Sequence, residues 1–176
     1  MQPIYTQTIS NSTTNGIFFN NIPQTFTDIQ IKFSVRSLVA AANNTMFFYL
    51  TDGGNNANYS ETYVFGAGSS VGSARVGTNS IDYGTGIFAN PGNTTTATTF
   101  GSGDIYFPNY TVSGTKKSYI IDVISENNAA TTGIYTELAA GLFHLTTPIT
   151  GAGFYLQGNN FFAPNSTFTL YGITKG

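Results

Sequence analysis

Alternation of apolar and polar residues is the dominant pattern of this chain, and it predicts β-strands. In residues 28–37 (DIQIKFSVRS) every second position from Ile29 to Val35 is apolar, and the positions between are Gln, Lys, Ser and Arg. Such a segment has one face toward a core and one toward solvent. Residues 166–173 alternate in the same way, so we expect a full-length strand inside a sheet there.

Two further segments have apolar residues at adjacent positions, which predicts strands covered on both faces. These segments are residues 45–51 (TMFFYLT) and 117–125 (KSYIIDVIS). A strand over 59–65 should follow the turn-forming residues 52–56, and the glycine-rich residues 66–72 should break the sheet. Shorter strands are expected over residues 3–10, 16–20, 71–76, 80–88, 104–107, 138–146 and 152–157.

No window of helical length combines i, i+3, i+4 apolar spacing with a capping residue, so the fold class should be all-β. About ten short strands between Gly, Asn and Pro turns indicate a two-sheet antiparallel sandwich, with a jelly roll as the first choice of topology and another connectivity as the alternative. Residues 1–176 are expected to form a single β-sandwich domain, because no linker or repeat divides them. Residues 1–15 are expected to be an extended N-terminal arm, and the unpatterned residues 89–103 a contact loop.

Composition narrows the function. Six basic and eight acidic residues make up 8% of the chain, against roughly 25% in an average soluble domain, so the surface must consist mainly of neutral polar groups. One histidine and no cysteine leave few groups for proton transfer or nucleophilic attack, and we expect a binding or structural protein rather than an enzyme. A net charge of −2 argues against nucleic acid, and neither a membrane span nor a signal peptide is visible.

Candidate chemistry is sparse. His144, between Phe143 and Leu145, is interpreted as a hydrogen-bonded strand histidine, because the sequence places no nucleophile or acid beside it. The turn 52–56 (DGGNN) offers oxygen atoms to calcium but lacks the carboxylates of a calcium loop, so we prefer a plain hairpin turn. We assign no catalytic, cofactor-binding or metal-binding residue. A glycosidase would need a carboxylate pair, and no spacing selects one, so these four acids are expected to be separate surface groups: Glu61, Asp122, Glu126 and Glu137.

Arginine and the aromatic residues are the other residue types that could make specific contacts. Arg36 and Arg75 are the chain's two arginines, and we expect each to pair with a carboxylate, with an ordinary exposed arginine as the alternative. The 15 Phe and 11 Tyr residues are expected in the core rather than on a sugar-binding platform.

Residues 19–36 (FNNIPQTFTDIQIKFSVR) resemble a recurrent β-sandwich module of tailed-bacteriophage virion proteins, especially those of marine and cyanobacterial phages. Three more blocks follow the pattern of that module in the same order: residues 53–60, 104–110 and 165–173. The resemblance spans nearly the whole chain. It departs at residues 61–65 (ETYVF), where a more basic strand would be expected.

The resemblance implies a jelly-roll-like particle component that binds other virion proteins and has no chemistry of its own. Because the module stands without the shaft of a tail fibre, it implies a capsid decoration or cement protein on the head, bound to the major capsid protein. It also implies a homo-oligomer, for which a trimer is one expected form. A tail or fibre-tip module that binds a host glycan or protein is the alternative. Gly172 in the last block is expected to leave room for a bulge or for another chain.

Overall fold

The computed structural model describes residues 1–50, 58–76, 86–126 and 135–175, and the side chains of residues 86–90 are outside this description. Strands dominate the described residues, which include one 3-10 turn, Gln157–Asn159, and no α-helix. The strands are β1 (Gln2–Thr8), β2 (Gly16–Phe19), β3 (Asp28–Val35), β4 (Asn43–Leu50), β5 (Tyr59–Ala67), β6 (Ser70–Val76), β7 (Gly86–Pro91), β8 (Gly101–Phe107), β9 (Lys117–Ser125), β10 (Tyr135–Phe143), β11 (Ala152–Leu156) and β12 (Thr167–Ile173).

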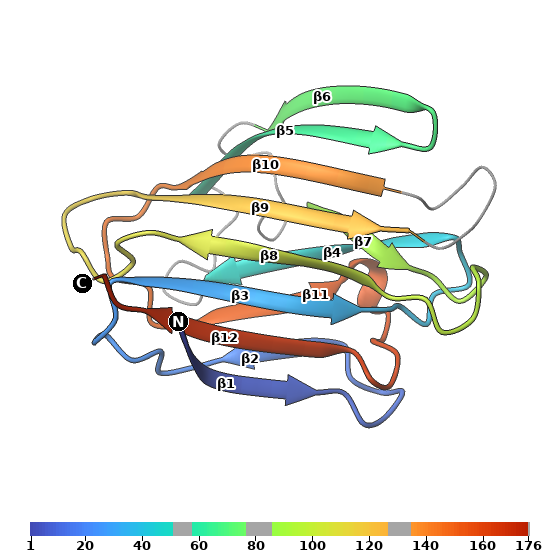
Figure 1. The fold of residues 1–176 in the computed structure, drawn as a ribbon, viewed down its shortest axis with the longest axis horizontal. Helices are drawn as coiled ribbons and strands as arrows, with labels where there is room; N and C mark the ends of the chain where they lie inside the picture. Colours follow the sequence, from blue (N-terminus) through green and yellow to red (C-terminus); the bar gives the residue numbers. More distant parts are fainter. Residues whose placement is uncertain (51–57, 77–85, 127–134, 176) are drawn as a thin grey trace.

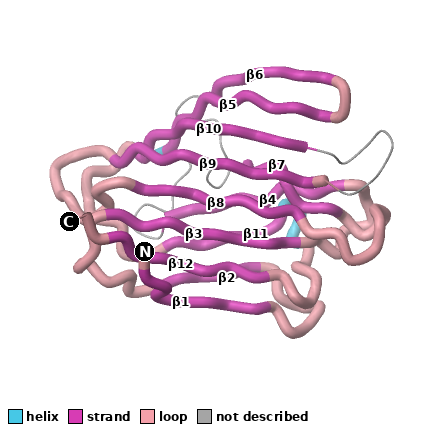
Figure 2. The backbone as a smooth tube through the Cα atoms, viewed as in Figure 1, coloured by secondary structure: helices cyan, strands magenta, loops and turns pink. Residues whose placement is uncertain are grey.

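These strands form two antiparallel sheets that pack face to face. The larger sheet has eight strands in the order β1-β12-β3-β8-β9-β10-β5-β6, and the smaller has four in the order β2-β11-β4-β7. In Figure 1 the larger sheet lies in front of the smaller one, and Figure 2 shows that most loops gather at the two ends of the strands. The all-β, two-sheet antiparallel sandwich predicted from the sequence is therefore confirmed.

Eight of the strands are connected as a jelly roll. β1, β12, β3 and β8 lie side by side in the larger sheet, and β2, β11, β4 and β7 form the smaller, as in a double Greek key. Two hairpins are inserted into this framework: β5–β6 between β4 and β7, and β9–β10 between β8 and β11. Together they continue the larger sheet beyond β8, and we call these four strands the extension. In Figure 1, β10, β5 and β6 reach beyond β7, the last strand of the smaller sheet.

The core lies between the two sheets. The four apolar residues of β3 are buried, as are Phe168 and Leu170 of β12, which confirms both alternating strands. Phe48 of β4 joins the layers, because its ring centroid lies 5.3 to 6.5 Å from those of Tyr59, Phe107, Tyr119 and Phe154. Replacing a ring with so many contacts by alanine costs about 3–5 kcal/mol.

Two predictions about the extension are wrong. Residues 66–72 do not break the sheet, because β5 and β6 form a hairpin with a two-residue turn that begins at Gly68. Gly68 has a φ of +58°, which a tight hairpin requires and glycine adopts without strain. β9 has only one buried face, because Ile120 and Ile124 are 51% and 52% exposed.

The N-terminal residues are not a free arm, so that prediction is also wrong. β1 pairs with β12 from Thr8 opposite Thr167 to Gln2 opposite Gly172, and Ile9 after it is buried in the core. The strand expected over residues 3–10 is present as β1, and as an edge strand it exposes most of its residues on both faces.

Two other details differ from expectation. β7 continues to Pro91 and β8 begins at Gly101, so the predicted contact loop is limited to residues 92–100. Gly172 makes room for the chain's own Phe26, because a Cβ at Gly172 would lie 2.4 Å from Cγ of that ring. β12 pairs with β3 there without a shift in register, whereas its pairing with β1 shifts close by, between Pro3 and Tyr5.

Candidate functional site

The outer face of the extension, turned away from the smaller sheet, carries a group of exposed apolar side chains. Pairing places Leu138 of β10 directly opposite Val64 of β5. Ile120 and Ile124 of β9 are diagonal neighbours of Leu138, and Val71 of β6 is a diagonal neighbour of Val64. Single exposed apolar residues are ordinary, but a contiguous group marks a binding surface. We call this surface the apolar face; it consists of Val64 (53% exposed), Val71 (91%), Ile120 (51%), Ile124 (52%) and Leu138 (53%).

The apolar face contains an open groove of about 600 Å³ over β5, β6 and β10. A small residue helps to keep it open, since Gly66 occupies the position opposite both Thr136 and Val71. A groove of this size accommodates side chains of a partner. Its lining residues are Val64, Phe65, Gly66, Val71, Gly72, Ser73, Thr136 and Leu138.

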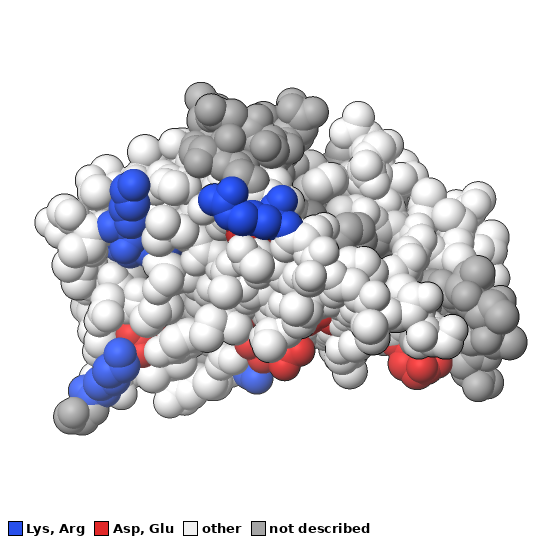
Figure 3. Space-filling view, turned by 90° about the horizontal axis from the view of Figure 1, so that it is seen from above, with Lys and Arg blue, Asp and Glu red and all other residues white. Residues whose placement is uncertain are grey.

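One charged group lies within this face, because Asp122 of β9 stands directly opposite Leu138, between Ile120 and Ile124. Lys32 of β3 forms an ion pair with Asp104 of β8 (Nζ to Oδ2, 3.5 Å), and Asp122 of β9 stands opposite Asp104. Figure 3, which views the molecule from the β6 end, shows few charged atoms, in small separate groups. Association through this region would therefore depend on apolar contact more than on electrostatic steering.

The inner face of the extension brings together two acids that the sequence left separate. Glu61 of β5 and Glu137 of β10 lie on neighbouring strands and are 3% and 1% exposed. The prediction of surface acids is wrong for this pair, whereas Asp122 and Glu126 are exposed as expected.

Glu137 has an unusual environment. Neither of its carboxyl oxygens has a hydrogen-bond partner in the described part of the chain. Burial, together with the nearby charge of Glu61, raises the pKa of Glu137 to about 8. The pKa of Tyr63 is raised as well, first by burial and then by the charges of Glu137 and Glu61. Glu137 is therefore mainly a neutral acid at pH 7.

Tyr119 reaches Glu61 across an intervening strand. Its Oη donates to Oε2 of Glu61 over 3.4 Å, although the two residues lie on β9 and β5 with β10 between them. The ring crosses β10 at Gly141, where a Cβ would be 1.9 Å from Cζ of Tyr119. A glycine at this position is thus required for the contact.

The buried pair does not have the exposure that a glycosidase requires. Such an enzyme needs two carboxyl groups, about 5 to 9 Å apart, on either side of a bound sugar. Glu61 and Glu137 are both covered in this structure, so a sugar cannot contact them.

His144, directly after β10, also lacks the arrangement of a catalytic base. Lys116 Nζ lies 3.4 Å from its Nδ1, and its Nε2 lies 3.2 Å from Ser60 Oγ. Because an ammonium group only donates, Nδ1 accepts and Nε2 carries the proton. Both ring nitrogens thus have polar neighbours, which agrees with the expected hydrogen-bonded histidine.

Metal binding has no support in the described ranges, where no three His, Asp or Glu side chains form a group that could hold an ion. The turn 52–56, considered for calcium, lies outside the described residues, as do residues 80–85 of the predicted strand 80–88. Within the described residues, no helix is long and apolar enough to cross a membrane.

Arg36 binds a loop, not the carboxylate that was predicted. Its guanidinium donates to the carbonyl oxygens of Thr96 and Thr99, both at 2.9 Å, and to Thr95 Oγ1 at 3.3 Å. These three threonines belong to the loop 92–100, which Arg36 holds against the sandwich. Arg75 is exposed on β6 and has no ion pair with another described residue, so the alternative interpretation applies to it.

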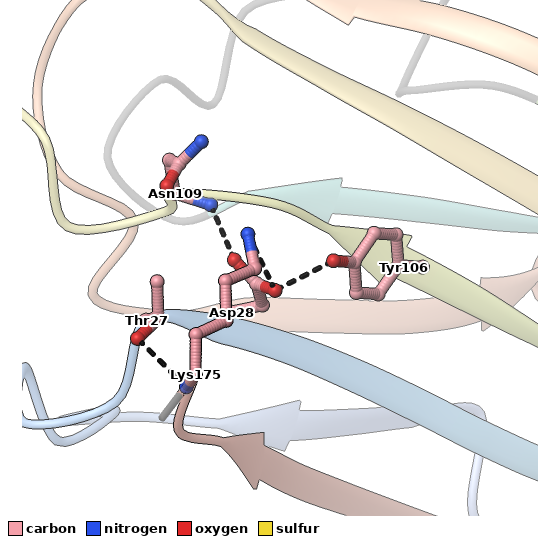
Figure 4. A network of polar contacts seen from close by, with 5 residues as sticks. All are labelled: Thr27, Asp28, Tyr106, Asn109 and Lys175. Atoms are coloured by element: carbon pink, nitrogen blue, oxygen red, sulfur yellow. Dashed lines mark hydrogen bonds and ion pairs between the residues drawn. The ribbon is translucent and has the colours of Figure 1, made fainter.

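A second polar network closes one end of the sandwich (Figure 4). Asp28 accepts hydrogen bonds from Tyr106 Oη (2.6 Å) and the Asn109 backbone N–H (2.9 Å), and its Oδ2 pairs with Lys175 Nζ at 3.2 Å. Lys175 also donates its backbone N–H to Thr27 Oγ1. Burial would raise the pKa of Asp28, but these hydrogen bonds and the ammonium charge outweigh it and lower the pKa. The network fixes the C-terminal residues to β3 and β8.

The outer face of the smaller sheet carries a row of aromatic side chains, contrary to the expectation that all of them serve the core. Phe18 lies 5.8 Å from Tyr49, Tyr49 5.9 Å from Tyr155, and Tyr155 5.3 Å from Phe47, measured between ring centroids. Phe18 is 45% exposed. We call these four residues the aromatic row.

The apolar face was missed because its sequence signal was interpreted as burial. Ile120 and Ile124 share one face of β9 with Asp122, and Val64 shares one face of β5 with Ser60 and Thr62. An apolar residue among the polar residues of one strand face could have indicated an exposed binding surface.

Comparisons of the chain with protein-family models, with curated proteins and with solved structures found no match.

Proposed function

We propose that this protein is a structural component of a tailed-bacteriophage particle, a capsid decoration protein that docks on the outer surface of the head. The observation that carries the proposal is the apolar face, where Val64, Ile120, Ile124 and Leu138 are each about half exposed on one sheet. Full burial of a side chain of this kind contributes about 1.5–3 kcal/mol, so covering the face would supply much of the binding energy. The partner is the major capsid protein.

Two further features support a particle role. The chain has few charges and a net charge of −2, so many copies can sit side by side on a shell with little repulsion. The four sequence blocks that resemble the phage module cover β3, β12, the end of β8 and the start of β5, which belong to the larger sheet. The jelly roll would then serve as the rigid support and the extension as the contact surface.

A rebinding assay tests the proposal. Purified chain is added to heads that lack it, and bound chain is quantified after sedimentation. Leu138→Lys places an ammonium at the centre of the apolar face and should weaken binding about tenfold or more, since each factor of ten is about 1.4 kcal/mol. Val112→Lys, in the loop between β8 and β9 where Val112 is 44% exposed, is the matched control and should bind as the wild type does. Equal binding by both variants would mean that another surface docks.

The aromatic row favours a second candidate, a receptor-binding module at the tail that stacks a host glycan on exposed rings. In that case Phe18→Ala should abolish binding to the host glycan, whereas Leu138→Lys should not affect it. A glycan array with both variants separates the two candidates.

A further inference from the structure

The edge of the extension is an unpaired strand. β6 ends the larger sheet, and no described strand pairs with its outer side. Its seven residues pair with β5 without a shift in register, so the backbone groups on the open side form a regular row. An open edge of this kind pairs readily with another strand.

The opposite edge of the same sheet, β1, is protected against pairing with another strand, whereas β6 is not. β1 contains Pro3, which has no N–H to donate, and a register shift between Pro3 and Tyr5. Proline and bulges are the devices that prevent edge pairing. β6 has neither, and Arg75 is its one charged residue.

Antiparallel pairing of two β6 strands brings no like charges opposite each other. When two copies pair antiparallel about Ser73, Val71 of one copy lies opposite Arg75 of the other, and Gly72 lies opposite Ala74. The aliphatic part of Arg75 can then cover Val71, which is 91% exposed in the single chain. The two Arg75 groups are separated by four residues along the strand direction, about 13 Å, which exceeds the screening length at physiological salt.

We propose that the protein forms a two-fold dimer in which β6 pairs antiparallel with β6 of a second copy, centred on Ser73. The two larger sheets then form one continuous sixteen-stranded sheet. Because a two-fold contact uses the same strand on both copies, it closes at the dimer and cannot build the trimer that the family resemblance implies. The inference does not rest on the proposed function, and Val64 and Leu138 of both copies stay open beside the two-fold axis.

Sedimentation velocity across a wide concentration range, with the full chain, tests this dimer. The expected mass is twice the 18.8 kDa of one chain. Ser73→Glu places two carboxylates opposite each other at the axis and should give a monomer with an unchanged circular dichroism spectrum. Ser118→Glu, exposed on β9 of the same sheet, adds the same charge away from the edge and should remain dimeric.

Oxidative cross-linking tests the register. The chain has no cysteine, so Ser73→Cys provides a single thiol on each copy. Directly opposite residues in an antiparallel pair have Cα atoms about 4.5–5.5 Å apart, within the range of a disulfide. Ser73→Cys should therefore give a covalent dimer and Thr62→Cys should not. A monomeric or trimeric wild type, or a dimer that Ser73→Glu leaves intact, would overturn the proposal.

Discussion

Glu137 is the side chain whose surroundings differ most from those of its residue type. A buried carboxyl without a hydrogen bond is tolerated as the neutral acid, because ionisation in an apolar environment is strongly unfavourable. The nearby Glu61 adds repulsion to that cost. The strand pair β5–β10 is consequently expected to tolerate acid better than alkali.

The free energy of unfolding should reveal this group through its pH dependence. The pKa of Glu137 is about 8 in the folded chain and about 4.5 when exposed, so between these pH values the native state binds more protons than the unfolded state. Stability from this group is therefore present below about pH 4.5 and falls as pH rises toward 8. Glu137→Gln should remove this decline and be more stable than the wild type at pH 9, by a few kcal/mol at about 1.4 kcal/mol per pKa unit.

Urea unfolding at a series of pH values measures the effect. Asp122→Asn removes an exposed carboxylate from the same sheet and is the control, which should keep the decline of the wild type. An unchanged decline in Glu137→Gln would contradict the assignment of a neutral, buried Glu137.

Asp28 should give the free energy of unfolding the opposite pH dependence to that of Glu137. Its pKa is lowered in the folded state, so its contribution to stability is present above its ordinary pKa near 3.8 and is lost as pH falls through the lower folded value. Asp28→Asn should cost about 1–3 kcal/mol at pH 7 and progressively less in acid. Asp104→Asn, which breaks an exposed ion pair with Lys32, should cost under about 1 kcal/mol at pH 7. Equal losses at pH 7, or a loss in Asp28→Asn that does not shrink in acid, would contradict this account.

At the scale of elements, sequence patterns revealed the strands that have one wet and one dry face. β3 and β12 alternate cleanly, and both lie inside the larger sheet. The sequence predicts a strand over residues 138–146, whereas β10 spans Tyr135–Phe143, because the inward-facing Glu137 interrupts its apolar face. The buried acid pair was not predictable, since the pairing of β5 with β10 joins residues far apart in the sequence.

The loop 92–100 is an element whose order depends on one residue. The Arg36 guanidinium reaches several acceptors on three threonines, and a lysine ammonium cannot span them. Arg36→Lys should therefore destabilise the loop by about 1–3 kcal/mol and speed hydrogen exchange at the amide of Asn93, which bonds to the Val39 carbonyl. Arg75→Lys, at an exposed site, should leave that exchange unchanged. Equal exchange in Arg36→Lys and the wild type would mean that the loop does not depend on this contact.

At the scale of the whole molecule, the jelly-roll strands enclose a core between two sheets, whereas the strands added to them have an exposed apolar face and an unpaired edge. The framework buries its core between two sheets, leaves the aromatic row on the outside of the smaller one, and ties its C-terminal residues through Asp28. The extension presents the apolar face on its outer side and the unpaired β6 at its edge. An added surface on a rigid support is consistent with a protein that binds a neighbour in a larger assembly.

Imaging of purified virions at a resolution that traces this chain, combined with its copy number by mass spectrometry, tests the central claim most directly. We expect the chain over the head surface, in a fixed ratio to the major capsid protein, with Val64 and Leu138 against the capsid. Absence from the particle, a position at the tail, or contact with the head through the aromatic row would contradict the account.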